Sequence, residues 1–301
     1  MNIRDLSYIV AVARLGHFGK AAESCHVSQP ALSSQIKKLE LELGVPIFER
    51  DKRSVRITET GQKIVALAEK ALAVTEDIRV TARAAQDPFS GKFRLGFIPT
   101  IAPYLVPHFV TKSREKLAKL DIHYHEDITD RLNAALMTGE VDAAILATPP
   151  EETGLDAIRL YDEPFWVIFP SRHALKLMDN IRTKDLPVDE LLLLTEGHCF
   201  RDQALDVCRL DEAPRGQTIR ATSLETLVNM VASDLGITLV PALSLEGGWL
   251  AARSIQSEKL KDPQAYRRIY LTFRKSDPRK ELLQKLADII CEDLPASVRR
   301  L

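Results

Sequence analysis

The sequence predicts an α/β body of two subdomains, preceded by a small all-α module and a long connecting helix. Three observations predict this class. Residues 1–58 hold short helical segments followed by a basic turn, and residues 59–88 form one amphipathic stretch. From residue 92 onward, apolar strands alternate with helices, which is typical of α/β folds. At 301 residues, the chain is long enough for such a body and one small module.

Composition and charge exclude several classes of protein. Hydrophobic residues make up 45% and charged residues 28%, as in ordinary globular proteins. No apolar run approaches the roughly 20 residues of a membrane helix, and the N-terminus lacks a signal peptide, so we expect a cytoplasmic protein without membrane contact. Residues 1–58 hold nine basic and six acidic residues, whereas the remainder carries a net charge of −4. A basic module on an acidic body is expected when one end meets nucleic acid.

The N-terminal module has the pattern of a helix-turn-helix. A helix in "RDLSYIVAVARLG" and a short one in "FGKAAESCHV" precede a third in "VSQPALSSQIKKLELELG". Ser28 can cap the third helix, Pro30 suits its first turn, and Gly44 ends it. One face of this helix is apolar, and the opposite face carries hydrogen-bonding and cationic side chains: Gln29, Ser33, Ser34, Lys37 and Lys38. We therefore expect it to be the recognition helix.

A basic turn follows, within "FERDKRSVRITETG". It carries Arg50, Lys52, Arg53 and Arg56 between two short β-prone runs, which is the pattern of a wing that contacts phosphates or the minor groove. The alternative is a three-helix bundle whose charged surface is incidental. The agreement of helix order, polar face and basic turn favours the winged module.

Residues 59–88 predict one long helix. Its apolar stripe consists of Ile64, Leu67, Ala68, Ala71, Val74 and Ile78, and neither Pro nor Gly interrupts the stretch between Gly61 and "DPFSG". A single helix cannot bury such a stripe alone, so two copies would pair and hold two DNA-binding modules at a fixed spacing. The alternative is that the helix packs on its own body.

The body alternates strands and helices, so we expect mostly parallel sheets with a cleft between two subdomains. Strands are predicted at 93–99, 120–127, 141–147, 164–170, 190–197 and 267–275, and helices at 103–117, 129–140 and 279–294. The stretch 218–243 reads as strand, helix, strand.

Cys199 and Cys208 lie nine positions apart in "TEGHCFRDQALDVC". On a helix they would be about 13–14 Å apart on opposite faces, whereas a disulfide needs Cα atoms within about 7 Å. A bond between them would therefore require the segment to unwind, as a redox switch does. His198, Arg201 and the strand-to-helix turn could each favour the thiolate of Cys199. Three alternatives remain: ordinary half-buried cysteines, a metal site, and a thiol peroxidase.

The stretch "FGKAAESCHVSQPALSSQIKKLELELGVPIFER" resembles the LysR-type transcriptional regulators, and the resemblance runs the length of the chain. It implies that Gln29, Pro30, Ser33, Ser34 and Lys38 line the DNA groove, and that Arg53 belongs to the wing. It also implies a periplasmic-binding-protein-like regulatory domain. The expected boundaries are 1–58 for the winged helix-turn-helix, 59–88 for the linker and dimerisation helix, and 89–301 for the regulatory domain. Its subdomains are 89–162 with 267–301, and 163–266, with crossings near 161–164 and 265–267.

The stretches "GHCFRDQAL", "RATSLETLVNMVA" and "GITLVPAL" are similar to the peroxide-sensing members of this family. That resemblance implies a peroxidatic Cys199 and a resolving Cys208. It also implies that Thr100, Thr129 and His198 place the peroxide, with a basic residue for which we favour Arg267 over Arg268. Cys25 and Cys291 are expected to be packing residues.

The predicted function is a hydrogen-peroxide-sensing regulator of oxidative-stress defence genes, switched by a reversible Cys199–Cys208 disulfide. The expected partners are double-stranded DNA, hydrogen peroxide, RNA polymerase and further copies of the chain, as a dimer of dimers. We expect no cofactor, no metal and no enzymatic turnover. The alternatives are a regulator that responds to a small organic effector in the same cleft, and a thiol peroxidase with a DNA tether.

Overall fold

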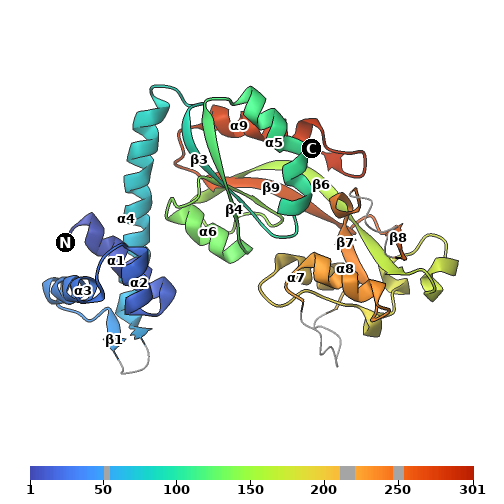
Figure 1. The fold of residues 1–301 in the computed structure, drawn as a ribbon, viewed down its shortest axis with the longest axis horizontal. Helices are drawn as coiled ribbons and strands as arrows, with labels where there is room; N and C mark the ends of the chain where they lie inside the picture. Colours follow the sequence, from blue (N-terminus) through green and yellow to red (C-terminus); the bar gives the residue numbers. More distant parts are fainter. Residues whose placement is uncertain (51–54, 211–220, 247–253) are drawn as a thin grey trace. The chain divides into compact units, whose positions relative to one another are not determined.

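The computed structural model describes residues 1–50, 55–210, 221–246 and 254–301. The chain divides into two compact units (Figure 1). The first comprises Met1–Ala82 with Met137–Glu140, and the second comprises Arg83–Leu136 with Val141–Leu301. Each unit is described in turn.

Three helices form the core of the first unit: α1 (Ile3–Leu15), α2 (Phe18–Ser24) and α3 (Gln29–Leu43). Asn2 and Asp5 form a reciprocal capping box that starts α1. The Gln35 amide of α3 donates to the buried Asp5 carboxylate over 2.8 Å, so the same acidic group caps α1 and ties it to α3. The recognition helix is thereby fixed against its neighbour.

The start of α3 differs from the prediction in one detail. Ser28 occupies the N-cap position, but its side chain forms no capping hydrogen bond, so the predicted cap is wrong in its chemistry. Pro30 lies in the first turn, where its missing N–H costs nothing. Gly44 ends the helix with φ of 72°, a left-handed conformation that favours glycine. Leu32, Ile36 and Leu39 bury the apolar face.

The wing is an antiparallel pair, β1 (Phe48–Arg50) with β2 (Val55–Ile57). The Glu40 carboxylate accepts the backbone N–H groups of Ile47 and Phe48 at 2.8 and 3.1 Å, which fixes where the chain leaves α3. Lys52 and Arg53, at the predicted tip, lie outside the described residues, as does the side chain of Arg50.

The predicted linker is one continuous helix, α4 (Glu59–Ala84), of 26 residues. Its stripe divides into two parts. Ile64, Ala68 and Leu72 pack against the core of the three-helix module. Leu67, Val74 and Ile78 remain 65%, 59% and 66% exposed, so this part of the stripe has no cover within its own unit.

The second unit is built on a mixed sheet (Figure 1). Its strands are β3 (Gly91–Phe97), β4 (Leu120–Glu126), β5 (Ala143–Leu146), β6 (Leu155–Pro170), β9 (Tyr266–Arg274) and β10 (Arg299–Arg300), in the order β10-β6-β9-β5-β3-β4. Only the β3–β4 and β3–β5 pairs are parallel among these strands. The expectation of mostly parallel sheets is therefore wrong, because β6 and β9 cross the body as an antiparallel pair.

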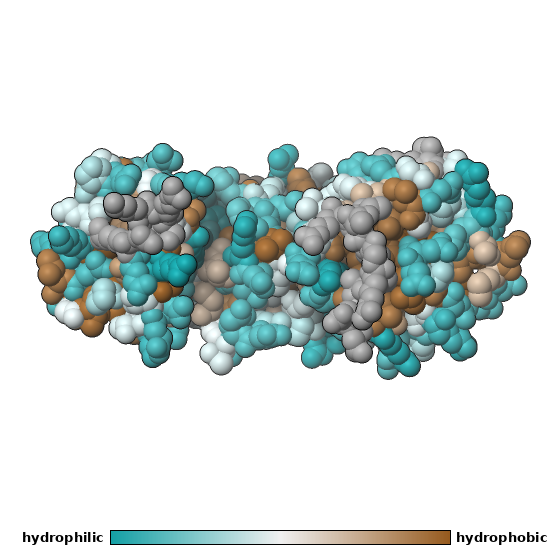
Figure 2. Space-filling model, turned by 90° about the horizontal axis from the view of Figure 1, so that it is seen from below, coloured by the Kyte–Doolittle hydropathy of each residue, from teal (hydrophilic) through white to brown (hydrophobic). Residues whose placement is uncertain are grey.

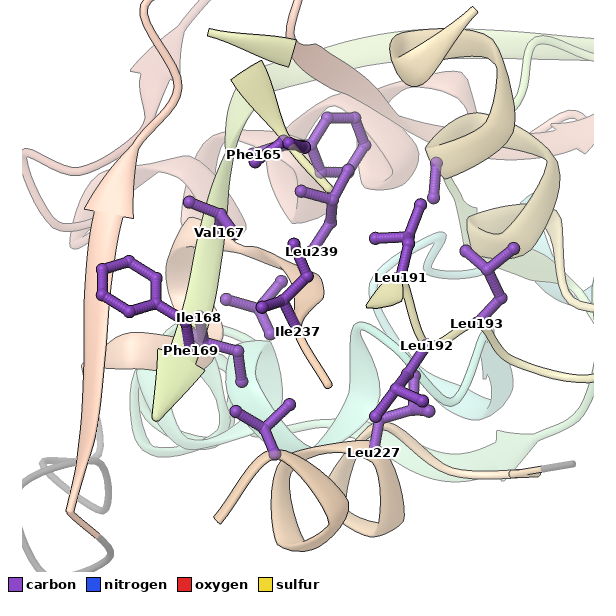
Figure 3. Close-up of a cluster of buried hydrophobic side chains, with 14 of the residues drawn as sticks. Phe165, Val167, Ile168, Phe169, Leu191, Leu192, Leu193, Leu227, Ile237 and Leu239 are labelled. Carbon is purple, nitrogen blue, oxygen red and sulfur yellow. The ribbon is translucent and has the colours of Figure 1, made fainter. Parts of the chain in front are cut away.

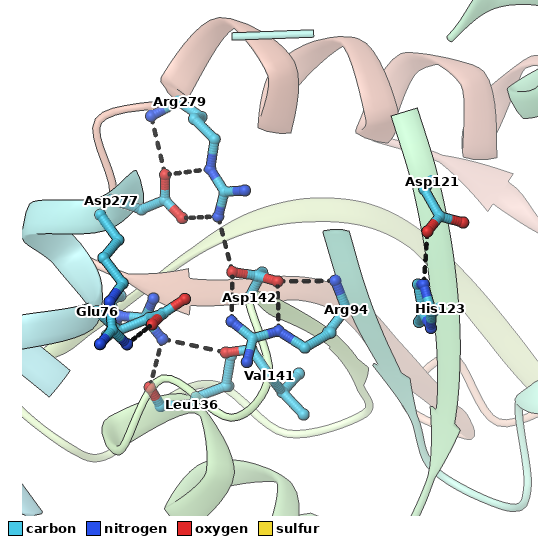
Figure 4. Close-up of polar contacts among 11 residues, drawn as sticks. Glu76, Arg94, Asp121, His123, Leu136, Val141, Asp142, Asp277 and Arg279 are labelled. Carbon is cyan, nitrogen blue, oxygen red and sulfur yellow. Dashed lines mark hydrogen bonds and ion pairs between the residues drawn. The ribbon is translucent and has the colours of Figure 1, made fainter. Parts of the chain in front are cut away.

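Three helices accompany this sheet: α5 (Ala102–Lys116), α6 (Thr129–Met137) and α9 (Lys280–Glu292). At its edge, Asp142 lies between Arg94 and Arg279, and Arg279 also pairs with Asp277 at 2.8 Å (Figure 4). Burial favours the protonated acid, but the hydrogen bond from Arg94 and the charge of Arg279 hold the pKa of Asp142 below its usual value. This network fixes the start of α9 against β3 and β5.

The far half of β6 belongs to a second core. Here β6 pairs with β7 (Thr238–Pro241) and β8 (Ile255–Lys259), beside α7 (Cys199–Cys208) and α8 (Leu224–Ala232). Side chains from β6, β7, α8 and residues 191–193 meet in this cluster (Figure 3). Short 3₁₀ turns at Ala174–Leu177, Thr183–Asp185, Val188–Glu190 and Ala242–Leu245 connect its elements.

The strand predicted at 190–197 does not form. Leu191 and Leu194 make only isolated bridges, to Ile237 and Ala221. The leucine run is buried, as its composition suggested, but it follows a 3₁₀ turn and lacks a continuous strand partner. A short apolar run reports burial and does not distinguish a strand from an extended segment.

Figure 2 shows one face of the molecule, where hydrophilic side chains cover much of the surface and apolar ones gather in patches. Among the described residues, no helix is both long and apolar enough to cross a membrane.

Candidate functional site

The helix α7 begins at Cys199 and ends at Cys208, so the two cysteines stand at its opposite ends. Both are free thiols, as are Cys25 and Cys291. Nine residues at 1.5 Å rise place the Cα atoms of Cys199 and Cys208 about 13–14 Å apart, well beyond the reach of a disulfide. The two thiols can therefore meet only if α7 unwinds.

A small cavity lies at the Cys199 end. Three segments of the second unit line it: the end of β3, the start of α6 and the start of α7. Its lining residues are Ile98, Pro99, Thr100, Ile128, Thr129, Gly197, His198, Cys199 and Phe200. The room for the centre of a water-sized sphere is about 10 Å³, at the threshold for holding one water molecule. The cavity therefore suits a ligand of very few atoms.

Two threonines line this cavity. Thr100 is buried, and Thr129 is 9% exposed at the first residue of α6. Burial raises the pKa of the Cys199 thiol and the Thr129 hydroxyl opposes that rise, although among the described residues its Oγ1 has no partner in full hydrogen-bonding geometry. A buried polar atom of this kind is costly unless a water or ligand completes its bonding.

Behind Thr100 lies a buried ion pair. Arg267 donates through Nη1 to Thr100 Oγ1 at 2.8 Å and through Nη2 to the Thr100 carbonyl at 2.9 Å. Its Nε donates to Glu163 at 2.8 Å, and the guanidinium lies 5.4 Å from the centre of the Phe200 ring. Arg268 instead pairs with Asp162 at 2.6 Å. Arg267 is thus the neighbour that reaches the site, although it supports Thr100 and does not itself line the cavity.

The electrostatics of Cys199 differ from the sequence expectation. Burial raises the pKa of the Cys199 thiol, while Thr129, Arg267 and the Phe200 amide oppose that rise. His198 does not supply a positive charge, because burial lowers its pKa and favours the neutral imidazole. Arg201 is engaged by Glu196 and Asp202 at 3.8 and 3.5 Å. The cation that favours the thiolate is therefore Arg267, the basic residue that the sequence analysis favoured at the site over Arg268.

The Cys208 end is apolar by comparison. Cys208 packs against the core cluster of Figure 3, and burial and the Asp262 carboxylate raise its pKa to about 11. Arg209 ends α7 with φ of 56°, in the left-handed region. A larger cavity of about 510 Å³ lies beside this end of the helix, lined by residues 203, 206, 207, 209 and 262–266 among others.

A tether holds the middle of α7. The Gln203 amide donates to the carbonyl of Ala147 over 2.7 Å, a contact between residues 56 positions apart in the chain. Its other atom, Oε1, is buried without a partner. Sequence reasoning missed Gln203 and Glu163, because each depends on a long-range contact; the only local signal was a charged residue ahead of the apolar run "PFWVIFP".

The predicted DNA-contacting face also has a definite geometry. Gln29, Pro30, Ser34, Lys37 and Lys38 are exposed on α3, and Ser33 is half-buried. Leu32, Ile36 and Leu39 of the same helix are buried, so α3 has one face in the core and one exposed polar face. In the described part of the chain, no group of three or more His, Cys, Asp and Glu side chains could hold a metal ion.

Cys25 and Cys291 occupy other surroundings. Cys25 packs against the helix-turn-helix core. Burial raises the pKa of Cys291 to about 11, and its Sγ donates to the Leu160 carbonyl at 3.5 Å. Neither lies beside the cavity at Cys199.

Two sequence families match the chain. Residues 3–62 match the bacterial regulatory helix-turn-helix proteins of the lysR family, and residues 86–295 match the LysR substrate binding domain. The chain therefore belongs to the LysR family of transcriptional regulators, and its N-terminal module is a DNA-binding domain. The predicted fold class and family are confirmed.

Within that family the chain is similar to OxyR. The hydrogen peroxide-inducible genes activator of Dickeya chrysanthemi is 38% identical over 310 residues, covering 100% of this chain and 98% of that protein. A full-length cysteine-to-aspartate variant of OxyR from Pseudomonas aeruginosa is 39% identical with a TM-score of 0.76, covering 100% and 98% of the two chains. A hydrogen-peroxide-bound cysteine variant of OxyR from Corynebacterium glutamicum is 34% identical with a TM-score of 0.65, covering 97% and 92%.

Proposed function

We propose that this protein is a transcriptional regulator that senses hydrogen peroxide through Cys199 and switches by forming a Cys199–Cys208 disulfide. The observation that carries the proposal is the small cavity at Cys199, flanked by Thr100 and Thr129, at one end of a helix whose other end is a second cysteine. The similarity to OxyR proteins, one of them solved with hydrogen peroxide bound, supports the same function.

In the first step, the Cys199 thiolate attacks one oxygen of hydrogen peroxide. The S–O bond forms as the O–O bond breaks, so sulfur is oxidised to sulfenic acid and the leaving hydroxide takes a proton to become water. Thr100, Thr129 and His198 hold the peroxide, and the charge of Arg267 raises the fraction of thiolate.

In the second step, the Cys208 sulfur attacks the Cys199 sulfenic acid. A disulfide forms, and the hydroxyl group leaves as water with the thiol proton. This step requires α7 to unwind, because the helix holds the two sulfurs apart. A cellular thiol reductant would restore both thiols by exchange, so peroxide is consumed once for each switching event.

The output of the switch is proposed to pass to DNA through paired chains. Leu67, Val74 and Ile78 of α4 supply an uncovered apolar stripe, and pairing of two such stripes would make a dimer. Gln29, Pro30, Ser33, Ser34, Lys37 and Lys38 would read the groove, with Arg50 and Arg53 on the wing. A dimer of dimers that contacts RNA polymerase, and activation of oxidative-stress defence genes, complete the proposal.

The first test exposes the reduced full-length chain to about equimolar hydrogen peroxide. Thiols are alkylated within seconds, and the peptides are mapped by mass spectrometry. We expect a Cys199–Cys208 disulfide, with Cys25 and Cys291 still alkylated as internal controls. Slow or indiscriminate oxidation of all four thiols would overturn the proposal.

Three further experiments separate the proposed sensor from a regulator of an organic effector and from a thiol peroxidase. A regulator of an organic effector keeps its transcriptional response when both Cys199 and Cys208 become serine, whereas the proposed sensor loses its response. A thiol peroxidase would show steady turnover of peroxide with a thiol reductant, at a rate independent of DNA. The proposed regulator instead changes its DNA contacts upon oxidation, which footprinting of the reduced and oxidised forms detects.

A further inference from the structure

Glu163 is a buried carboxylate that none of the site predictions used. It is 0% exposed, and it stands directly opposite Arg267 in the antiparallel register of β6 and β9. One carboxylate oxygen accepts from Arg267 Nε at 2.8 Å, and the other accepts from the backbone N–H of Leu243 at 2.8 Å. The oxygen that accepts from Nε also lies 2.8 Å from Arg267 Nη2, so Glu163 holds the guanidinium that donates to Thr100.

The donors of Arg267 determine the role of Thr100. A guanidinium donates five hydrogen bonds and accepts none. Since Nη1 donates to Thr100 Oγ1, the threonine oxygen is an acceptor in that bond, and its own proton remains to be donated elsewhere. Thr100 lines the cavity, so this proton can be donated to a ligand there.

We propose that Glu163 is a positioning residue for peroxide cleavage, acting through Arg267 to fix Thr100 as the hydrogen-bond donor to the leaving oxygen. As the O–O bond breaks, negative charge develops on that oxygen, and a donor already aimed at it stabilises the transition state. Glu163 itself touches neither the peroxide nor Cys199. This inference rests on the proposed function.

The chain contains a matched control for this role. Asp162 precedes Glu163, is 3% exposed, and pairs with Arg268 on the same two strands at 2.6 Å. Both carboxylates are buried on β6 and pair with an arginine of β9, although Asp162 also pairs with Arg299. Glu163 is the one whose arginine reaches Thr100. Loss of either charge should lower stability, but only Glu163 should change peroxide chemistry.

The experiment compares two reactions of one thiol. In a C208S background, the rate constants of Cys199 with hydrogen peroxide and with iodoacetamide are measured over a pH series, for the parent and for E163Q, D162N, T100V and E163Q/T100V. Both reagents need the thiolate, but only peroxide expels an oxygen that Thr100 can stabilise. The ratio of the two rate constants therefore cancels any change in thiol pKa and isolates the positioning effect.

We expect E163Q to lower the peroxide-to-iodoacetamide ratio by about tenfold, since misplaced groups can reduce rates by up to about 100-fold. D162N should leave the ratio unchanged. E163Q/T100V should be no slower with peroxide than T100V, because the two residues act as one unit. Equal loss in both reactions, or additive losses in the double variant, would overturn the inference.

A second variant keeps the test decisive if E163Q fails to fold. E163L/R267M replaces the whole buried pair by apolar side chains, which is often tolerated. Its ratio should fall to that of T100V, and a ratio equal to the parent's would overturn the inference. Failure of the proposed function is recognised separately, because parent Cys199 would then react with peroxide no faster than Cys25 or Cys291.

Discussion

The two ends of α7 each carry a cysteine, yet they have opposite surroundings. The Cys199 end meets hydroxyls, a backbone amide and the charge of Arg267 around a cavity of about 10 Å³. The Cys208 end packs on an apolar core, and burial together with the Asp262 carboxylate raises the pKa of its thiol. Both thiols have a raised pKa, but groups that favour the thiolate oppose the shift only at Cys199. These surroundings favour reaction of the Cys199 thiol with an oxidant before that of Cys208.

The largest expected difference between the two ends concerns the cysteines themselves. Cys208→Ser should leave the first oxidation intact and stop at Cys199 sulfenic acid, which dimedone traps. Cys199→Ser should leave Cys208 reduced at the same peroxide concentration, because its surroundings disfavour the thiolate. Mass spectrometry of the dimedone adducts measures both. If Cys208 in Cys199→Ser were oxidised as fast as Cys199 in Cys208→Ser, the two ends of α7 would not differ in reactivity.

The second prediction concerns pH. Because the folded-state pKa of Cys199 is raised and the thiolate reacts, its rate with peroxide should increase by about tenfold per pH unit below that pKa. Between about pH 6 and pH 8 this amounts to about 100-fold. Burial lowers the pKa of His198, so its own titration moves away from neutral pH towards the acidic end of this range. Stopped-flow oxidation of Cys208→Ser protein checks the profile; a flat profile would show that Cys199 is already ionised.

The third prediction removes the cation of the Cys199 end. Arg267→Met should raise the pKa of Cys199 further and slow its alkylation by iodoacetamide by about tenfold at neutral pH. It also leaves Glu163 buried without its partner, which should destabilise folding by about 3–5 kcal/mol. Arg268→Gln changes the neighbouring ion pair and is the control; it should leave the pKa of the Cys199 thiol unchanged. Equal alkylation rates in all three proteins would show that Arg267 does not tune Cys199.

The fourth prediction loosens the helix between the two ends. Gln203→Leu removes the hydrogen bond to the Ala147 carbonyl, which stabilises the folded α7 of the reduced state by about 0.5–1.5 kcal/mol. Formation of the disulfide from the sulfenic acid should therefore become several-fold faster. The initial peroxide reaction should not change. Rapid-quench kinetics separates the two steps. An unchanged closure rate would mean that Gln203 does not restrain the helix.

The smallest expected effect is at Asp262. Asp262→Asn removes the negative charge that raises the pKa of Cys208, so disulfide closure should become about two- to threefold faster near neutral pH. The Asn carbonyl can still accept the Thr183 backbone N–H, which Asp262 accepts at 2.7 Å. The same rapid-quench assay reports the rate. A slower closure would indicate that the carboxylate instead acts as a base.

Local signals in the sequence predicted the elements that depend on neighbouring residues. Pro30 and Gly44 marked the recognition helix, and uninterrupted periodicity marked α4. The bounds of α7 agree with the helix assumed for Cys199–Cys208. The direction of β6 against β9, the irregular path of residues 190–197 and the contacts of Glu163 and Gln203 were not predictable. Each of these depends on a partner far away in the chain.

The same limit explains the error over His198 and Arg201. Their nearness to Cys199 in sequence suggested that they would stabilise the thiolate, but burial neutralises the histidine and acidic neighbours occupy the arginine. The effective cation comes from β9, 68 positions further along the chain. The domain boundaries and the individual DNA-contacting residues stay predictions.

The shortness of α7 has a consequence for how a cell reads the signal. A helix of 10 residues is too short to persist in water once its packing is lost, so a form in which α7 is only partly unwound has little stability. Each molecule is therefore expected to be either reduced with α7 folded or disulfide-bonded with α7 unwound. At an intermediate peroxide concentration, the fraction of molecules in the disulfide form would change, and each single molecule would still be in one of the two states.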